Sequence, residues 1–153
     1  MFAGCGSKSR PDNVADGQVP SSDSVWIVAK GQHKTDVRNL FLQRGMRVED
    51  DALSNSVIGA SGRSIRWVNA DWDMAVCRFD ADNKLSAVSI VRSGEFEDGE
   101  VMSDSLMSVV YELQRIFGES KPLSSEKWQF INTEHVNVSI TSDRNTTVDV
   151  IWE

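Results

Sequence analysis

The hydrophobic residues of the C-terminal half first repeat with the period of an α-helix and then with the period of a β-strand. The helical stretch has apolar residues at i, i+3, i+4, i+7, i+10 and i+11, namely Leu106, Val109, Val110, Leu113, Ile116 and Phe117. This spacing predicts an amphipathic helix. Ser103 is a suitable N-cap, and Gly118 followed by Pro122 predicts where the helix ends.

A second, shorter helix is predicted in the N-terminal half, within the stretch KTDVRNLFLQRG. Its apolar residues share one helical face, Thr35 or Asp36 is the expected cap, and Gly45 is the expected stop. The preceding VWIVA, residues 25–29, predicts a short extended segment. Between residues 46 and 62 the pattern predicts one helical turn in EDDALSNSVIG and a loop at GASG.

The remaining segments alternate apolar and polar residues, which is typical of β-strands. One predicted strand contains Ile65 and Trp67, and DMAVCRFDADNKLSAVSIVR predicts two more strands that are separated by a turn at ADNK. Three further strands are predicted after the second helix, at residues 128–130, 136–140 and 148–152.

The two halves of the chain match each other at a shift of 61 residues. Without a gap, Trp67 falls on Trp128, and residues 75, 77, 79, 87, 89 and 91 fall on residues 136, 138, 140, 148, 150 and 152. We therefore predict an α+β fold in which two helix-plus-three-strand units, at about 25–92 and 101–153, form one antiparallel sheet with both helices on one face. Residues 25–153 would form a single domain behind a start and tether at residues 1–24.

This tandem layout resembles α-β-β-β proteins of the β-lactamase-inhibitor type and the BamE-like outer-membrane assembly lipoproteins. If alternate residues face away from the helices, the second unit presents the largely polar residues 135, 137, 139, 141, 147, 149 and 151, and the first unit presents the more apolar residues 74, 76, 78, 88, 90 and 92. Either VWIVA folds over the apolar run, or the apolar run is a docking surface for a partner. The predicted partner-binding residues are Trp72, Met74, Val76, Val88, Ile90 and Arg92.

Charge excludes some classes of function. The chain of 153 residues has a formal net charge of -7, which argues against a nucleic-acid partner and against electrostatic docking onto anionic lipid. An acidic surface is compatible with a basic protein partner. No apolar run approaches the length that spans a bilayer.

Residues that carry chemistry are few and scattered. Cys77 lies in a predicted core strand, where a cysteine is an inert hydrophobe, and His33 and His135 lack the spacing of a metal site or a catalytic triad. The acidic run Glu95, Glu97, Asp98, Glu100 and Asp104 is read as a solvated loop or as a contact for a basic partner. The sequence therefore predicts no catalytic residue, no metal and no cofactor.

The first residues suggest an attachment point. FAGC, residues 2–5, resembles the lipobox of bacterial lipoproteins, in which the cysteine is lipidated, although Phe2 stands where the family usually has leucine. Residues 6–24 have the polar composition of a disordered tether.

This resemblance implies a protein anchored by a lipid on Cys5 at the periplasmic side of the envelope, at the outer membrane in preference to the inner one. The predicted function is non-catalytic binding of another protein as an inhibitor, an immunity protein or an assembly factor. The alternatives are a periplasmic protein that binds a small ligand and a cytosolic interaction module.

Overall fold

The computed structural model describes residues 22–93, 100–124, 127–131, 135–143 and 145–153. These residues form two helices and ten strands. The helices are α1 (Lys34–Gln43) and α2 (Glu100–Phe117). The strands are β2 (Ser24–Val25), β3 (Val28–Ala29), β4 (Arg47–Asp51), β5 (Ser56–Trp67), β6 (Ala70–Phe79), β7 (Leu85–Ser93), β8 (Ser120–Ser124), β9 (Lys127–Phe130), β10 (Val136–Asp143) and β11 (Asn145–Trp152).

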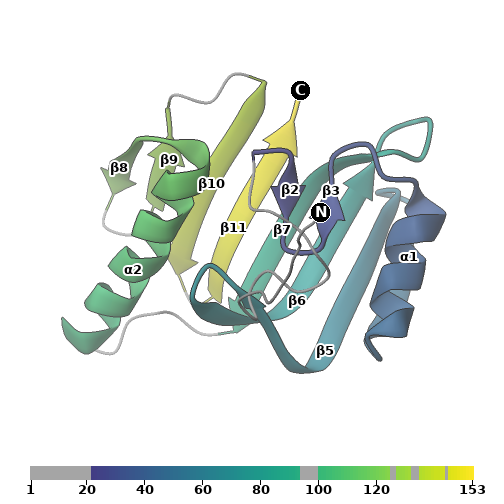
Figure 1. Ribbon diagram of the computed structural model, residues 1–153, viewed down its shortest axis with the longest axis horizontal. Helices are drawn as coiled ribbons and strands as arrows, with labels where there is room; N and C mark the ends of the chain where they lie inside the picture. The colour runs from purple at the N-terminus through teal and green to yellow at the C-terminus, as the bar shows by residue number, and fades with distance from the viewer. Residues whose placement is uncertain (1–21, 94–99, 125–126, 132–134, 144) are drawn as a thin grey trace, which may run out of the picture.

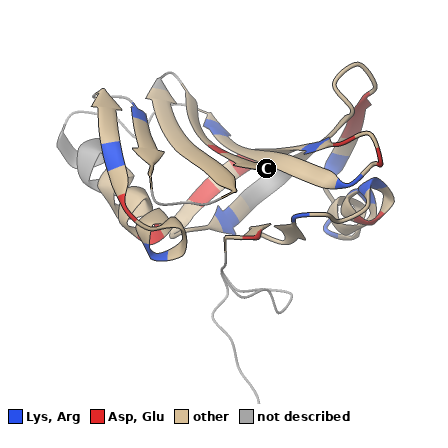
Figure 2. Ribbon diagram, turned by 90° about the horizontal axis from the view of Figure 1, so that it is seen from above, with Lys and Arg blue, Asp and Glu red and all other residues tan. Residues whose placement is uncertain are grey.

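Eight of the described strands form one sheet in the order β4-β5-β6-β7-β11-β10-β9-β8, and every neighbouring pair is antiparallel (Figure 1). Each half of the sheet is a meander of four strands that follows one helix. The last strands of the two halves, β7 and β11, pair from Ala87–Ile151 to Ser93–Asn145 and join the halves. Figure 2 shows both helices and the β2–β3 hairpin on one side of the sheet, which we call the helix face. The opposite side is the outer face.

The predicted α+β class with two helix-plus-three-strand units is wrong, because the fold is mostly β and each helix precedes four strands. The two unexpected strands are the edges of the sheet. The β4 segment, RVEDD, is polar and largely exposed, so it lacks the alternation that marks a half-buried strand. The β8 segment contains Pro122, which an edge strand tolerates because one side of its backbone has no partner strand.

Helix α1 is held at its start by His33, where Thr35 or Asp36 was the predicted cap. The Nδ1 atom of His33 accepts a hydrogen bond from the Thr35 backbone N–H at 3.1 Å. The helix ends before Gly45, whose φ of +73° is the left-handed conformation that glycine adopts without strain. Its inner face buries Val37 and Phe41 completely.

Helix α1 lies so close to the sheet that β5 needs a glycine beneath it. A β-carbon at Gly59 would lie 2.6 Å from a ring carbon of Phe41, a side chain with no exposed surface. Contacts this short force packed groups to shift, so only glycine fits at this point of the sheet.

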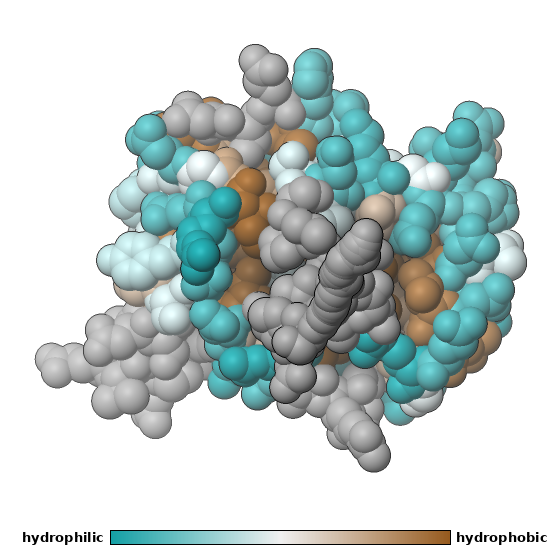
Figure 3. All heavy atoms as spheres, in the orientation of Figure 1, coloured by the Kyte–Doolittle hydropathy of each residue, from teal (hydrophilic) through white to brown (hydrophobic). Residues whose placement is uncertain are grey.

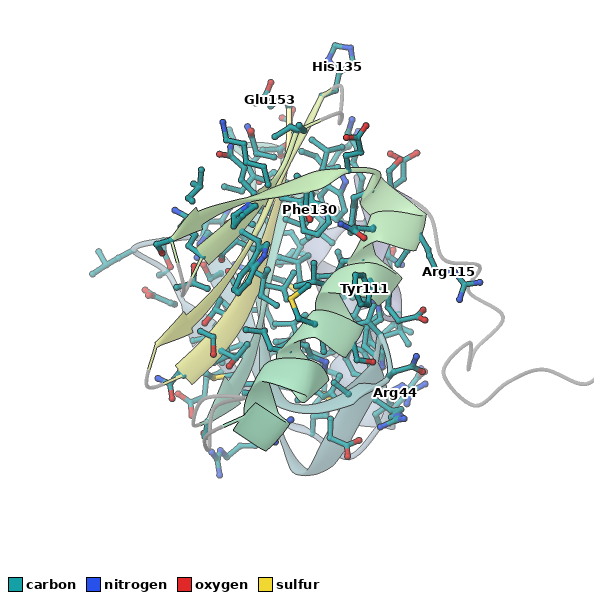
Figure 4. The ribbon with its side chains drawn as sticks, turned by 90° about the vertical axis from the view of Figure 1, so that its left-hand side faces the viewer. Arg44, Tyr111, Arg115, Phe130, His135 and Glu153 are labelled. Carbon is teal, nitrogen blue, oxygen red and sulfur yellow. The ribbon has the colours of Figure 1, made fainter. Side chains whose placement is uncertain are left out.

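The core lies between the helix face of the sheet and the elements that cover it. Helix α2 contributes the residues predicted from its 3.6-residue period, Leu106, Val109, Val110, Leu113 and Phe117, all at most 3% exposed. Phe117 meets Phe130 of β9 edge to face, with ring centroids 6.1 Å apart. Figure 4 shows Phe130 between the sheet and α2.

The β2–β3 hairpin fills the space between the two helices (Figure 1). Val25, Ile27 and Val28 are at most 2% exposed and belong to the same core cluster as Val88 and Ile90. VWIVA therefore covers the helix face and not the outer face.

Two aromatic contacts hold the hairpin in place. Trp26 stacks on Phe41 at 6.1 Å, and the guanidinium of Arg44 lies 5.2 Å from the Trp26 ring. At the other end of the hairpin, the Trp152 indole N–H donates to the Ser22 carbonyl oxygen at 2.7 Å. Residues 22–24, which the sequence analysis assigned to the tether, thus belong to the fold.

A β-bulge decides which side chains of β7 face the core. Arg78 pairs with Ala87 but Phe79 pairs with Leu85, so Ser86 has no partner of its own, and its hydroxyl donates to the Arg78 carbonyl oxygen at 3.2 Å. The extra residue reverses the orientation of every side chain that follows it. The ungapped shift of 61 residues ignores this bulge, and its assignment of residues 87, 89 and 91 to the helix face is wrong.

We predict that neighbouring truncations in β7 differ sharply in their effect on stability. Ile90→Ala removes a fully buried side chain from the helix face and should lower the free energy of unfolding by about 2–4 kcal/mol. Val91→Ala, on the partly exposed outer face, should cost less than about 1 kcal/mol. Urea unfolding of both variants measures the difference. Equal losses, or a larger loss for Val91→Ala, would contradict the bulged register.

Candidate functional site

The outer face of the sheet is built from three rows of side chains, two that run across six strands and one that runs across five. Residues paired across neighbouring antiparallel strands lie side by side on the same face. The first row is Ala60, Met74, Val91, Thr147, Thr141 and Lys127; the second is Ile58, Val76, Ser89, Asp149, Ser139 and Gln129; the third is Ser56, Arg78, Ala87, Ile151 and Asn137. No described helix or hairpin packs on these rows, since both helices and β2–β3 lie on the other side (Figure 2).

The outer face is apolar in its first half and polar in its second. In the part that belongs to β5, β6 and β7, only Ser56, Arg78 and Ser89 carry polar side chains. In the part that belongs to β11, β10 and β9, only Ile151 is apolar. We call the contiguous set Ile58, Ala60, Met74, Val76 and Val91 the apolar patch; each of these residues is partly exposed.

A polar line connects the two halves at the centre of this face. A guanidinium N–H of Arg78 donates to the Ser89 hydroxyl at 3.4 Å, and that hydroxyl donates to the Asp149 carboxylate at 2.5 Å. Ser89 is only 4% exposed, whereas Arg78 is exposed to solvent. These two hydrogen bonds therefore run from β6 through β7 to β11, and they hold the Arg78 guanidinium beside the apolar patch.

The structure divides the predicted partner-binding residues between the two sides of the sheet. Met74 and Val76 lie on the outer face and are partly exposed. Val88 and Ile90 are fully buried on the helix face, opposite Cys77 and Ala75.

The remaining two predicted residues are not part of the apolar patch. Trp72 has no exposed surface, and its indole N–H donates to the Trp67 carbonyl oxygen at 3.0 Å. Arg92 pairs with Thr146, a buried residue whose hydroxyl shares a hydrogen bond with Ser142 at 3.0 Å. The six residues thus do not form one surface.

Three members of the apolar patch were missed from the sequence. Ile58 and Ala60 belong to a segment for which the sequence predicts a helical turn followed by a loop. The residues VIGA, 57–60, pair with β6 in regular alternation, and comparing the two segments could have identified this strand. Val91 was assigned to the core because the Ser86 bulge leaves no clear sequence signal. The polar second half was predicted correctly, since no bulge interrupts the β10–β11 pairing.

Cys77 is buried, as the sequence predicted, and its surroundings suppress its reactivity. Burial raises the pKa of its thiol to about 12, although the neighbouring positive charge of Arg78 acts in the opposite direction. Because the thiol of the unfolded chain ionises near pH 9.0, the contribution of this burial to stability is complete below that pH and is lost as the pH rises toward 12. At neutral pH the side chain is a neutral thiol packed between Val57 and Val88.

The other residues singled out from the sequence have structural roles or lie outside the described part. His135, with φ of +63°, is exposed at the end of the sheet beside Glu153, whose backbone N–H donates to the His135 carbonyl (Figure 4). In the turn ADNK, the carboxylate of Asp80 accepts from the N–H groups of Asp82 and Lys84, as expected of a hairpin turn. Cys5 and the acidic residues Glu95, Glu97 and Asp98 lie outside the described residues, and Glu100 and Asp104 belong to α2.

The helix side of the molecule also has exposed side chains. Seen from that side, hydrophobic residues show between hydrophilic ones (Figure 3). Tyr111 is 59% exposed on α2, and Arg115 lies on the solvent side of the same helix, where it pairs with Glu112 (Figure 4).

Comparison with protein-family models, with curated proteins and with solved structures gives no match to this chain. Among the described residues, no three His, Cys, Asp or Glu side chains are grouped so that they could hold a metal ion. Neither helix, over its described residues, has the length and hydrophobicity required to cross a bilayer.

We predict that Cys77 resists alkylation in the folded protein. In a Cys5→Ser background, iodoacetamide at pH 8 should leave the thiol unmodified over hours, because the side chain is buried and its pKa of about 12 keeps it protonated. The same reagent should modify it fully in denaturant, and intact mass measures both. Rapid alkylation without denaturant would show that the strand opens or that the thiol is accessible.

Proposed function

We propose that this chain is a non-catalytic protein of the bacterial cell envelope that is anchored through a lipid on Cys5 and binds another protein with the outer face of its sheet. The observation that carries the proposal is the apolar patch, which lies on a face that no described element covers. Contiguous partly exposed apolar residues beside polar ones are the arrangement found at protein-binding surfaces.

The size of the outer face supports a protein as the ligand. Six strands about 4.8 Å apart and three rows about 7 Å apart give a surface on the order of 600 Å². A standard interface buries about 800 Å² on each partner. The area of this face lies at the lower end of the range for specific interfaces, so the face can carry a specific complex.

The two edges of the sheet are poorly suited to extend it with a strand from a partner. Strand β4 carries exposed charges, with Arg38 2.5 Å from the Asp50 carboxylate and Arg47 3.8 Å from Glu49. Strand β8 contains Pro122, which has no backbone N–H, and the exposed Lys121. Charges and proline on edge strands oppose strand addition, which leaves the face as the better docking surface.

A binding face on an anchored domain suits three roles: inhibition of an enzyme, immunity against a toxin, and support of an envelope assembly. All three require only that the face be presented to a partner. The lipobox-like FAGC supports the anchor, and the fold supplies the surface.

We predict that one added charge in the apolar patch abolishes partner binding while the same charge in the polar half does not. Val76→Asp and Ser139→Asp lie in the same row and are equally open to solvent, so both should fold. Val76→Asp should weaken capture of the partner at least about tenfold, because a carboxylate would be buried against apolar groups.

The measurement is quantitative capture from a solubilised envelope extract of a cell that carries the gene, with the intact chain as bait. Proteins retained by the unsubstituted chain and by Ser139→Asp, but lost with Val76→Asp, are the expected result. Identical retention by all three baits would eliminate the outer face as the binding surface.

We also predict that Cys5 carries the lipid. When the gene is expressed with its native upstream region, the protein should fractionate with membranes and its mass should include a diacylglyceryl group on Cys5. Cys5→Ser should release it to the soluble fraction without altering its thermal unfolding. An unmodified Cys5 in the membrane-free fraction would remove the anchor and leave the binding face to be judged separately.

A further inference from the structure

We infer that the partner docks an apolar surface on the patch and pairs a carboxylate with Arg78. This inference rests on the proposed function and specifies the chemistry of the protein that binds. It follows from the position of Arg78, which lies in the same face as the apolar patch, two residues beyond Val76 on β6.

Arg78 is held in place by a hydroxyl and makes no direct ion pair among the described residues. Its contact with the Ser89 hydroxyl uses one of the five N–H donors of the guanidinium. Ser89 is fixed in turn by the Asp149 carboxylate on the next strand. Within the described part of the chain, Arg78 has no ion-pair partner, so its charge and remaining donors are available to a ligand.

Other arginines of the described residues are paired with carboxylates. These pairs are Arg38–Asp50, Arg47–Glu49, Arg66–Asp71 and Arg115–Glu112. Arg78 is different because it contacts a carboxylate only through the Ser89 hydroxyl, and because it stands beside the apolar patch. Arginine, with tryptophan and tyrosine, is enriched among the residues that contribute most to binding at protein interfaces.

The free N–H donors of the exposed Arg78, beside the apolar patch, favour a partner carboxylate at this point of the outer face. The Asp149 carboxylate lies within about 6 Å of the Arg78 guanidinium, because the Ser89 hydroxyl joins them through hydrogen bonds of 3.4 and 2.5 Å. It orients the guanidinium through this hydroxyl without forming a direct ion pair, so the other N–H donors of Arg78 can still bind a partner carboxylate. Lys127 is the other cation of this face, but it lies four strands and two rows away in the polar half, about 24 Å from Arg78. Docking on the patch would exclude water from the Arg78 pair and strengthen it.

The test places a photo-crosslinking residue at Met74, within the patch, in the full chain expressed in cells that carry its partner. Arg78→Glu and Lys127→Glu are then compared in this background; both residues are exposed, so both variants should fold. Arg78→Glu should lower the crosslink yield at least about tenfold, and Lys127→Glu should leave it within about twofold. The crosslinked partner peptide should contain an Asp or Glu, and changing that residue to Arg should restore the yield with Arg78→Glu.

The possible outcomes separate this inference from the proposed function. An undiminished crosslink in Arg78→Glu, or a partner peptide without an acidic residue, overturns the pairing of Arg78 with a partner carboxylate. Either result leaves protein binding at the outer face intact. A crosslink to a second copy of this chain also overturns the inference, because the occupant is then the protein itself. No crosslinked product from Met74 contradicts both the inference and the proposed binding face.

Discussion

The pairing of β7 with β11 is the interaction on which the architecture depends. It joins two four-strand meanders into one sheet, so that a single core serves both halves. The paired residues Val88 and Val150, and Ile90 and Val148, have no exposed surface on the helix face. Each meander alone would have one helix and half of the β2–β3 cover, and would leave these residues facing water.

The two halves repeat one scheme on the helix face and differ on the outer face. Both use a helix followed by four antiparallel strands, and both bury branched apolar residues toward the helices. On the outer face the first half retains apolar residues, and the second half carries polar ones such as Ser139 and Thr141. Stability requires only one of the two faces to be apolar, so the apolar patch calls for another explanation, and binding of a partner supplies one.

The sequence predicts those elements whose periodicity is not interrupted. Helix α2 was located from its apolar residues, and the burial of Cys77 followed from strand alternation. The hairpin β10–β11 has a regular register, so its polar and apolar sides were assigned correctly. In each case burial on one side imposes the pattern that the sequence displays.

The features that were missed depend on backbone geometry and not on hydrophobic pattern. Edge strands β4 and β8 bury little, so no periodicity identifies them. The bulge at Ser86 inserts one residue without any glycine or proline to mark it, and it moved Val88 and Ile90 to the wrong side of the predicted sheet. The candidate surface could be half predicted for this reason: Met74 and Val76 of β6 were assigned correctly, and the contributions of β5 and β7 required the register.

The hydrogen bond between the Trp152 indole and the Ser22 carbonyl has a mechanical consequence. It places the point where the chain enters the fold on the helix face, because Trp152 lies on that side of β11. A tether from a lipid to Ser22 would thus attach on the helix face, whereas a bound protein would lie on the outer face. A force between the membrane and the bound protein would then act across the sheet and the core. It would not separate the strands one after another.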